Sequence, residues 1–197
     1  MKLLFVNACI RGEKSRTFEL CQDYLKKFGD AKEGQDWEIE EINLNEMEIK
    51  PLDNEELTKR DELLKVGNTD DPMFDLAKQL IQADHILIGA PYWDFSFPAK
   101  LKIYLERCSV TGVTFVYSPE GNPEGKCRAN EVIYLTTAGS PIGEYNLGYD
   151  YVKGLCSLFG IDKKYFASAE GIDIIGNDVK KIMDEAKAQI TTIIREL

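Results

Sequence analysis

One short stretch, "NACIRGEKSRTFEL" at residues 7–20, places cations and hydroxyls between an apolar run and a helical pattern. The whole chain has a formal charge of −10, so such a group of cations stands out. A helix N-terminus presents unpaired N–H groups and the positive end of the helix dipole, and both favour an anion. Hydroxyls and charge-assisted hydrogen bonds would add to this. Ser15 and Thr17 would supply the hydroxyls, and the charged donors would be Arg11, Lys14 and Arg16.

The pattern in this first loop (residues 8–17) limits the kind of anion. It contains neither the Walker A motif nor G-x-G-x-x-G, so nucleoside triphosphates and dinucleotides are not its natural ligands. A terminal monophosphate fits better. The alternative is that Ser15 only caps a helix and that the neighbouring cations are solvated.

Two further loops also follow apolar runs. The second loop, "APYWDFSFPAK" (residues 90–100), is rich in aromatic side chains. A flat heteroaromatic ring would stack there or be held by backbone groups, unless the aromatic side chains simply close the core. The third loop, "TTAGSPIGEYN" (residues 136–146), begins with small residues. These would let the backbone approach a ligand closely, or they form an ordinary turn at a strand end.

The elements around these loops follow an alternating pattern. Apolar runs predict strands, and helical spacing predicts helices between them. We expect strands at 2–7, 37–44, 85–91, 131–139 and 164–171, and helices at 18–28, 53–66, 74–81, 98–108, 149–159 and 179–194. This alternation predicts a parallel sheet covered by helices on both faces. In such sheets ligands bind beyond the carboxyl ends of the strands, so the three loops should meet.

Length and composition restrict the class of protein further. The 197 residues fit one domain, 1–197. The acidic charge argues against nucleic acid or an anionic membrane as partner, and we expect neither a signal peptide nor a membrane span. The five irregularly spaced cysteines favour a reduced, cytoplasmic protein without a metal site. His85, at the start of a strand, is expected to be structural.

Several segments together resemble one family, the flavodoxin-like NAD(P)H-dependent quinone reductases and FMN-dependent azoreductases. Residues 90–108, "APYWDFSFPAKLKIYLERC", look like its flavin-contacting segment. The stretches at 112–125, 132–140 and 151–172 are similar to later parts of that family, in the same order. The resemblance implies an α/β, flavodoxin-like three-layer sandwich, with a five-stranded parallel sheet and helices on both faces. It also implies non-covalently bound FMN.

The resemblance further implies a role for particular residues. Ser15, Arg16 and Thr17 would hold the FMN phosphate with help from Cys9 or Arg11; Pro91, Tyr92, Trp93, Asp94 and Phe95 would border the isoalloxazine ring; Thr137, Ala138, Gly139 and Ser140 would contact its pyrimidine side; Tyr117 and Tyr145 would lie in the substrate pocket. Cys9 stands where the family usually has Ser, and Asp94 where Asn is typical. A thiol is a poor donor, and a carboxylate would disfavour an anionic reduced ring.

The implied activity is that of an FMN-dependent NAD(P)H oxidoreductase acting as a homodimer with shared active sites. NADH or NADPH would donate a hydride through flavin N5, and a quinone, azo or nitro acceptor would take two electrons in a ping-pong sequence. This chemistry needs no catalytic side chain. One alternative is a flavodoxin-type electron carrier with protein partners, although the first loop lacks the T-x-T-G-x-T pattern of flavodoxins. Another is an interaction domain of the same fold without flavin.

Overall fold

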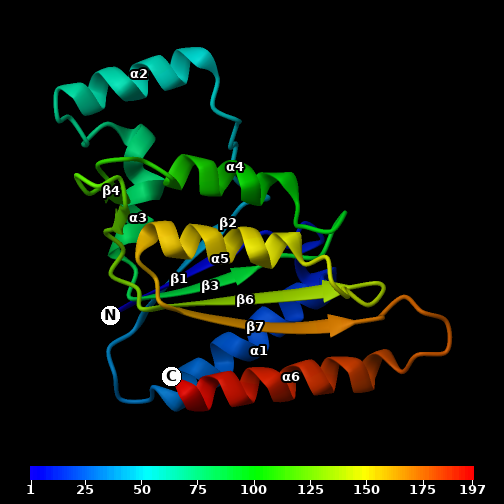
Figure 1. Ribbon diagram of the computed structural model, residues 1–197. Coiled ribbons are helices and arrows are strands. Elements are labelled where there is room, and N and C mark those ends of the chain that lie inside the picture. Colours follow the sequence, from blue (N-terminus) through cyan, green and yellow to red (C-terminus); the bar gives the residue numbers. More distant parts are fainter.

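The computed structural model describes residues 1–197 and contains a five-stranded parallel sheet between two layers of helices (Figure 1). Its strands are β1 (Lys2–Asn7), β2 (Glu38–Asn43), β3 (His85–Gly89), β6 (Glu131–Ala138) and β7 (Lys163–Glu170). They lie in the order β2-β1-β3-β6-β7, so the strand order reverses between β1 and β3. The predicted three-layer fold is therefore confirmed, and the strand bounds differ from the prediction by at most two residues.

The central strands β1, β3 and β6 are buried on both of their faces, whereas the edge strand β2 is mostly exposed. Helices α1 (Arg16–Ala31) and α6 (Val179–Glu196) cover one face, and α3 (Asp75–Gln82), α4 (Ala99–Cys108) and α5 (Leu147–Phe159) cover the other. Along β1, Leu3 and Phe5 pack toward α1 and α6, while Leu4 and Val6 pack toward the opposite layer. This two-sided burial explains the continuous apolar runs in the sequence. Every helix lacks either the length or the hydropathy that crossing a membrane requires.

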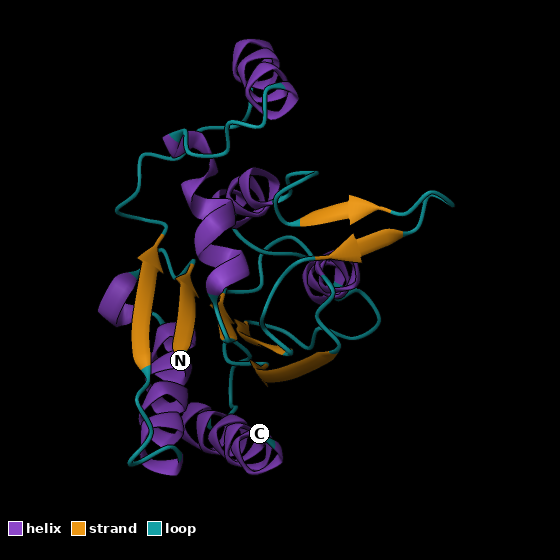
Figure 2. Cartoon of the chain, turned by 90° about the vertical axis from the view of Figure 1, so that its left-hand side faces the viewer, coloured by secondary structure: helices purple, strands orange, loops and turns teal.

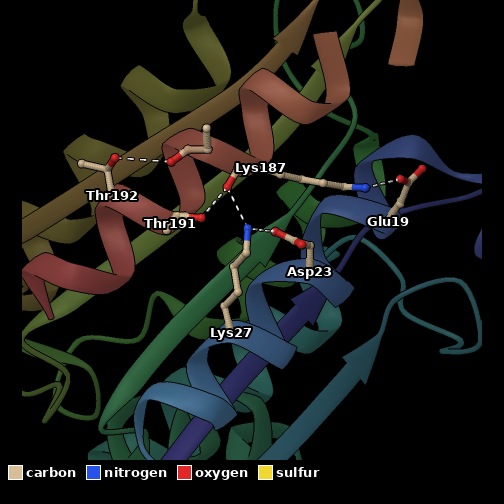
Figure 3. A network of polar contacts seen from close by, with 7 residues as sticks. Glu19, Asp23, Lys27, Lys187, Thr191 and Thr192 are labelled. Atoms are coloured by element: carbon tan, nitrogen blue, oxygen red, sulfur yellow. Dashed lines mark hydrogen bonds and ion pairs between the residues drawn. The ribbon is translucent and has the colours of Figure 1, made fainter. Parts of the chain in front are cut away.

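Polar contacts join α1 to α6 (Figure 3). Lys187 Nζ donates to Glu19 Oε1 at 2.6 Å, and this hydrogen bond raises the pKa of Lys187. Lys27 Nζ donates to Asp23 Oδ2 at 2.7 Å and to the backbone oxygen of Lys187 at 2.8 Å. Such partly exposed ion pairs add little to the free energy of unfolding. They do fix α1 along α6, and the N-terminus of α1 ends the first loop.

One helix and one pair of strands lie outside the sheet and the helices that cover it. Helix α2 (Asn54–Lys65) stands apart from the sheet (Figure 2), and it begins as predicted, with Asp53 Oδ1 accepting from the Glu56 amide at 2.9 Å. The antiparallel pair β4 (Phe115–Tyr117) and β5 (Pro123–Gly125) was not predicted. Figure 1 places this hairpin on the side of the amino ends of the sheet strands.

His85 also lies at the amino edge of the sheet, where it starts β3. Its side chain is 1% exposed. Nδ1 lies 2.8 Å from Glu131 Oε1, and Nε2 is hydrogen-bonded to the hydroxyl of Tyr24. The ring of Phe28 packs against it. His85 therefore joins α1, β3 and β6 inside the fold, far from the three loops.

Candidate functional site

The three loops meet at the carboxyl edge of the sheet around one cleft of about 240 Å³. Ten of the residues that were predicted from the sequence line it: Arg11, Lys14, Ser15, Arg16, Thr17, Pro91, Tyr92, Trp93, Thr137 and Gly139. Three others complete the lining: Ile10, Ile172 and Asp173. One end of the cleft is therefore cationic and the other aromatic.

The cationic end is built on the N-terminus of α1. Ser15 is the N-cap, and its Oγ accepts from the Phe18 amide at 3.3 Å. The amides of Arg16 and Thr17 in the first turn have no carbonyl partner within the helix. Three cations surround this helix end: Arg11, Lys14 and Arg16. Ser15 is thus an N-cap, as one interpretation of the first loop predicts, and the cations lie around the same helix end, an arrangement that suits an anion.

A buried pair of hydroxyls ties this end to the third loop. Thr17 Oγ1 and Thr137 Oγ1 lie 2.7 Å apart, and both side chains are buried. The pair connects the first turn of α1 with the end of β6, on the sheet face that α1 covers. The first and third loops are consequently held in a fixed relation at the cleft.

The aromatic end is a tight turn after β3. The Trp93 amide donates to the Ser96 oxygen at 3.0 Å, and the Ser96 amide donates back at 2.7 Å. Between them Asp94 and Phe95 both have positive φ, 47° and 66°, as a type I′ turn requires. A bulky side chain at such a φ is strained. The turn keeps the indole of Trp93 at the cleft, where the side chain is 45% exposed.

Tyr92 anchors this turn to the third loop. Its amide donates to the Thr137 oxygen at 3.0 Å, and its hydroxyl donates to the Tyr145 oxygen at 2.7 Å. Burial, followed by the charge of Glu170, raises the pKa of Tyr92, so the hydroxyl stays protonated as a donor. The ring of Tyr145 meets that of Phe95 edge-on, with 5.8 Å between centroids.

Several predicted residues do not line the cleft. Cys9 and Ala138 are buried beneath it, and Cys9 Sγ donates to the Gly89 oxygen at 3.6 Å. Three exposed residues lie outside the lining: Asp94, Phe95 and Ser140. Tyr145 stands next to the cleft through Tyr92. Tyr117 is in β4, at the opposite edge of the sheet.

Sequence reasoning missed the residues that follow β7. The Asp173 amide donates to the Gly139 oxygen at 3.1 Å, and Asp173 Oδ1 lies 3.4 Å from Nη1 of Arg16. A Cβ on Gly139 would come within 2.5 Å of Asp173 Oδ2, so a larger residue there would require the exposed side chain of Asp173 to move. The fifth strand ends at the same edge as its neighbours, and this was the available signal. The rule that ligands bind where the strand order reverses indicates only the loops after the first, third and fourth predicted strands.

Known proteins resemble this chain over its whole length. The sequence profile of a family described by its flavodoxin-like fold matches residues 1–194. An FMN-dependent NADH:quinone oxidoreductase of Clostridium beijerinckii is 31% identical over 94% of this chain and 93% of its own. One from Coprothermobacter proteolyticus is 29% identical, covering 99% and 98%. The crystal structure of an azoreductase from Bacillus anthracis has the same fold, with a TM-score of 0.87 at 21% identity over 100% of both chains.

Proposed function

The chain belongs to the flavodoxin-like family of FMN-dependent NADH:quinone oxidoreductases, and from this premise we propose that it is a flavoenzyme. It would use FMN to carry two electrons from NADH to a quinone or azo compound. The observation that carries the proposal is the cleft itself, because a cationic helix end and an aromatic turn face one space at the reversal of strand order.

The donor set fits the phosphate of FMN. The amides of Arg16 and Thr17 would donate to phosphate oxygens, and the charges of Arg11, Lys14 and Arg16 would balance the dianion. Cys9 would contribute only by holding the shape of the first loop, since its thiol is buried against Gly89 and its amide donates to Asn7 Oδ1. This answers the departure from serine at position 9: the weaker side-chain donor is directed away from the cleft.

The aromatic end suits the isoalloxazine ring. Pro91, Tyr92 and Trp93 would border the ring, and the backbone around Thr137 and Gly139 would meet its pyrimidine side. Bound FMN would accept a hydride at N5 and deliver two electrons to the acceptor. The exposed indole of Trp93 would help to exclude water and offer a flat surface to nicotinamide and acceptor in turn. If nicotinamide and acceptor occupy the same place in turn, the reaction follows a ping-pong sequence. Planar nitro compounds would fit this place as well.

We further propose a homodimer with shared sites. Tyr117 is 57% exposed, yet its strand, β4, lies on the side of the amino ends of the sheet strands, away from the loops that line the cleft. It would therefore serve a substrate pocket only in the cleft of a second copy. Exposed apolar side chains near the cleft, namely Trp93, Phe95, Tyr145 and Leu147, would find cover in such an assembly. All five cysteines are free thiols, which suits a reducing compartment such as the cytoplasm.

The test begins with the absorption spectrum of the purified protein after addition of FMN and removal of unbound flavin. Flavin bands that bleach on anaerobic addition of NADH and return on addition of a benzoquinone are the expected result. Flavin that binds but does not bleach would favour an electron carrier with protein partners. A protein that binds no flavin would overturn the proposal and leave the interaction domain.

A further inference from the structure

Two asparagines that do not line the cleft, Asn7 and Asn45, hydrogen-bond to the backbone of the first loop. Cys9, at the start of the loop, has both of its backbone polar groups engaged. Its amide donates to Asn7 Oδ1 at 2.9 Å, and its oxygen accepts from Asn45 Nδ2 at 2.8 Å. The same oxygen accepts from the Gly12 amide at 3.0 Å, which closes the turn leading into the cationic residues. Asn45 therefore bonds directly to the turn that precedes α1.

Asn45 belongs to a short turn after β2 that a lysine of another element secures. Lys100 Nζ donates to three backbone oxygens of this turn: Leu44 at 2.8 Å, Asn45 at 3.2 Å and Met47 at 3.1 Å. The Leu44 amide also donates to the Asn7 oxygen at 2.9 Å. The turn at residues 44–47 is thus bound on one side to β1 and on the other to Lys100.

Lys100 occupies a position that is electrostatically unfavourable for a lysine. It lies in the first turn of α4, where the helix dipole disfavours a cation. Three carbonyl oxygens offset that cost, and all of them come from the turn after β2. Lys100 is also the last residue of the second loop. One chain of contacts therefore runs from the aromatic loop through residues 44–47 to the cationic loop, outside the cleft.

We propose that Asn45 and Lys100 are positioning residues, which hold the Cys9–Gly12 turn in the conformation that binds the flavin phosphate. This rests on the proposed function, since it assigns the phosphate of FMN to the first loop. Neither residue touches the cleft, so each acts through the backbone. Without the amide of Asn45, the Cys9 oxygen keeps only the Gly12 amide, and the loop gains other conformations that must be lost again when phosphate binds.

The experiment compares FMN with riboflavin, which has the same ring and no phosphate. Asn45→Ala and Lys100→Met should each weaken FMN binding by about tenfold, the size of one lost hydrogen bond, and leave riboflavin binding unchanged. Asn45→Asp keeps the size of the side chain and removes the donor, so it should behave like Asn45→Ala. The double variant should lose no more affinity than the weaker-binding single variant, because both residues act through one turn.

Matched controls come from the same chain. Lys102→Met changes a lysine of the same helix whose partner is Glu106, and Asn68→Ala removes an asparagine that shapes a turn in another loop. Both should bind FMN like the wild type. Equal loss of FMN and riboflavin binding, unchanged FMN binding, or variants that all unfold would each assign the two residues to the fold alone and overturn the proposal. A wild-type protein that binds neither flavin would instead refute the proposed function.

Discussion

A single carboxylate, Asp173, stands among the cations of the cleft, where it opposes the charge of a phosphate. It pairs with Arg16 at 3.4 Å, and both side chains are largely exposed. Asp173→Asn keeps the shape against Gly139 and removes the charge. We expect this variant to bind FMN about threefold more tightly at low salt, with the gain shrinking above about 0.15 M salt because exposed charges are screened. Quenching of flavin fluorescence at two ionic strengths measures this.

Riboflavin is the control for Asp173, because its affinity should not depend on that charge. Weaker FMN binding by Asp173→Asn would show that the carboxylate orients Arg16 toward the phosphate. Some residues of the cleft were predictable from the sequence alone. Ser15, Arg16 and Thr17 were predictable because their types suit an anion at a helix start. Asp173 was not, since its contacts with Gly139 and Arg16 depend on how the chain turns after β7.

At the scale of elements, the turn at Trp93–Ser96 combines strain with exposure. Phe95 has a φ of 66° and a side chain that is 57% exposed. Phe95→Gly should raise the free energy of unfolding by up to about 1 kcal/mol, because glycine adopts this φ without a Cβ clash. It should also raise the KM for the acceptor, since the ring beside Tyr145 is lost. Urea unfolding and steady-state rates test both effects.

Asp94→Gly is the matched variant for this turn, because it relieves the neighbouring positive φ and keeps the aromatic ring. It should gain similar stability with no change in KM. A destabilised Phe95→Gly variant would mean that the contact with Tyr145 outweighs the backbone strain. Strain at such a place agrees with the general tendency of functional turns to carry it.

One contact at the amino edge of the sheet, between Glu131 and His85, should make stability depend on pH. Burial raises the pKa of Glu131, but the hydrogen bond and charge of His85 outweigh this, and its pKa is lowered from 4.5. A lowered folded pKa stabilises the protein above the unfolded value, and the contribution is lost as pH falls through the folded pKa. Glu131→Gln should therefore unfold in less urea than the wild type at about pH 7, and the difference should shrink below about pH 4.

The exposed Glu144 provides the control, since Glu144→Gln should leave the urea midpoint unchanged at both pH values. A constant difference between wild type and Glu131→Gln would show that packing, not charge, stabilises this contact. The elements themselves were largely predictable. Two-sided burial made β1, β3 and β6 continuous apolar runs, and Asp53 marked the start of α2. The β4–β5 hairpin escaped prediction because each strand has three residues, too few for a period.

In the whole molecule, the loops that line the cleft follow the carboxyl ends of the sheet strands, and the β4–β5 hairpin lies on the side of their amino ends (Figure 1). The sequence placed Tyr117 in the substrate pocket through a resemblance, and pattern alone could not show that a single copy keeps it away from the cleft. The length of the strands separates the loops at their carboxyl ends from the hairpin at their amino ends. A second copy is the simplest way to bring the tyrosine and the cleft together.

Mixed dimers test this arrangement. Tyr117→Ala should raise the KM for the acceptor without changing FMN affinity, and Lys14→Glu/Arg16→Glu should abolish FMN binding by reversing charge at the cationic end of the cleft. A mixed dimer has one site with an intact cleft from the first chain and an intact Tyr117 from the second. Random mixing should therefore restore about one quarter of the wild-type activity at low acceptor concentration, since half of the dimers are mixed and each has one complete site. If each chain used its own Tyr117, mixing would restore nothing, because no chain would hold both halves of the site.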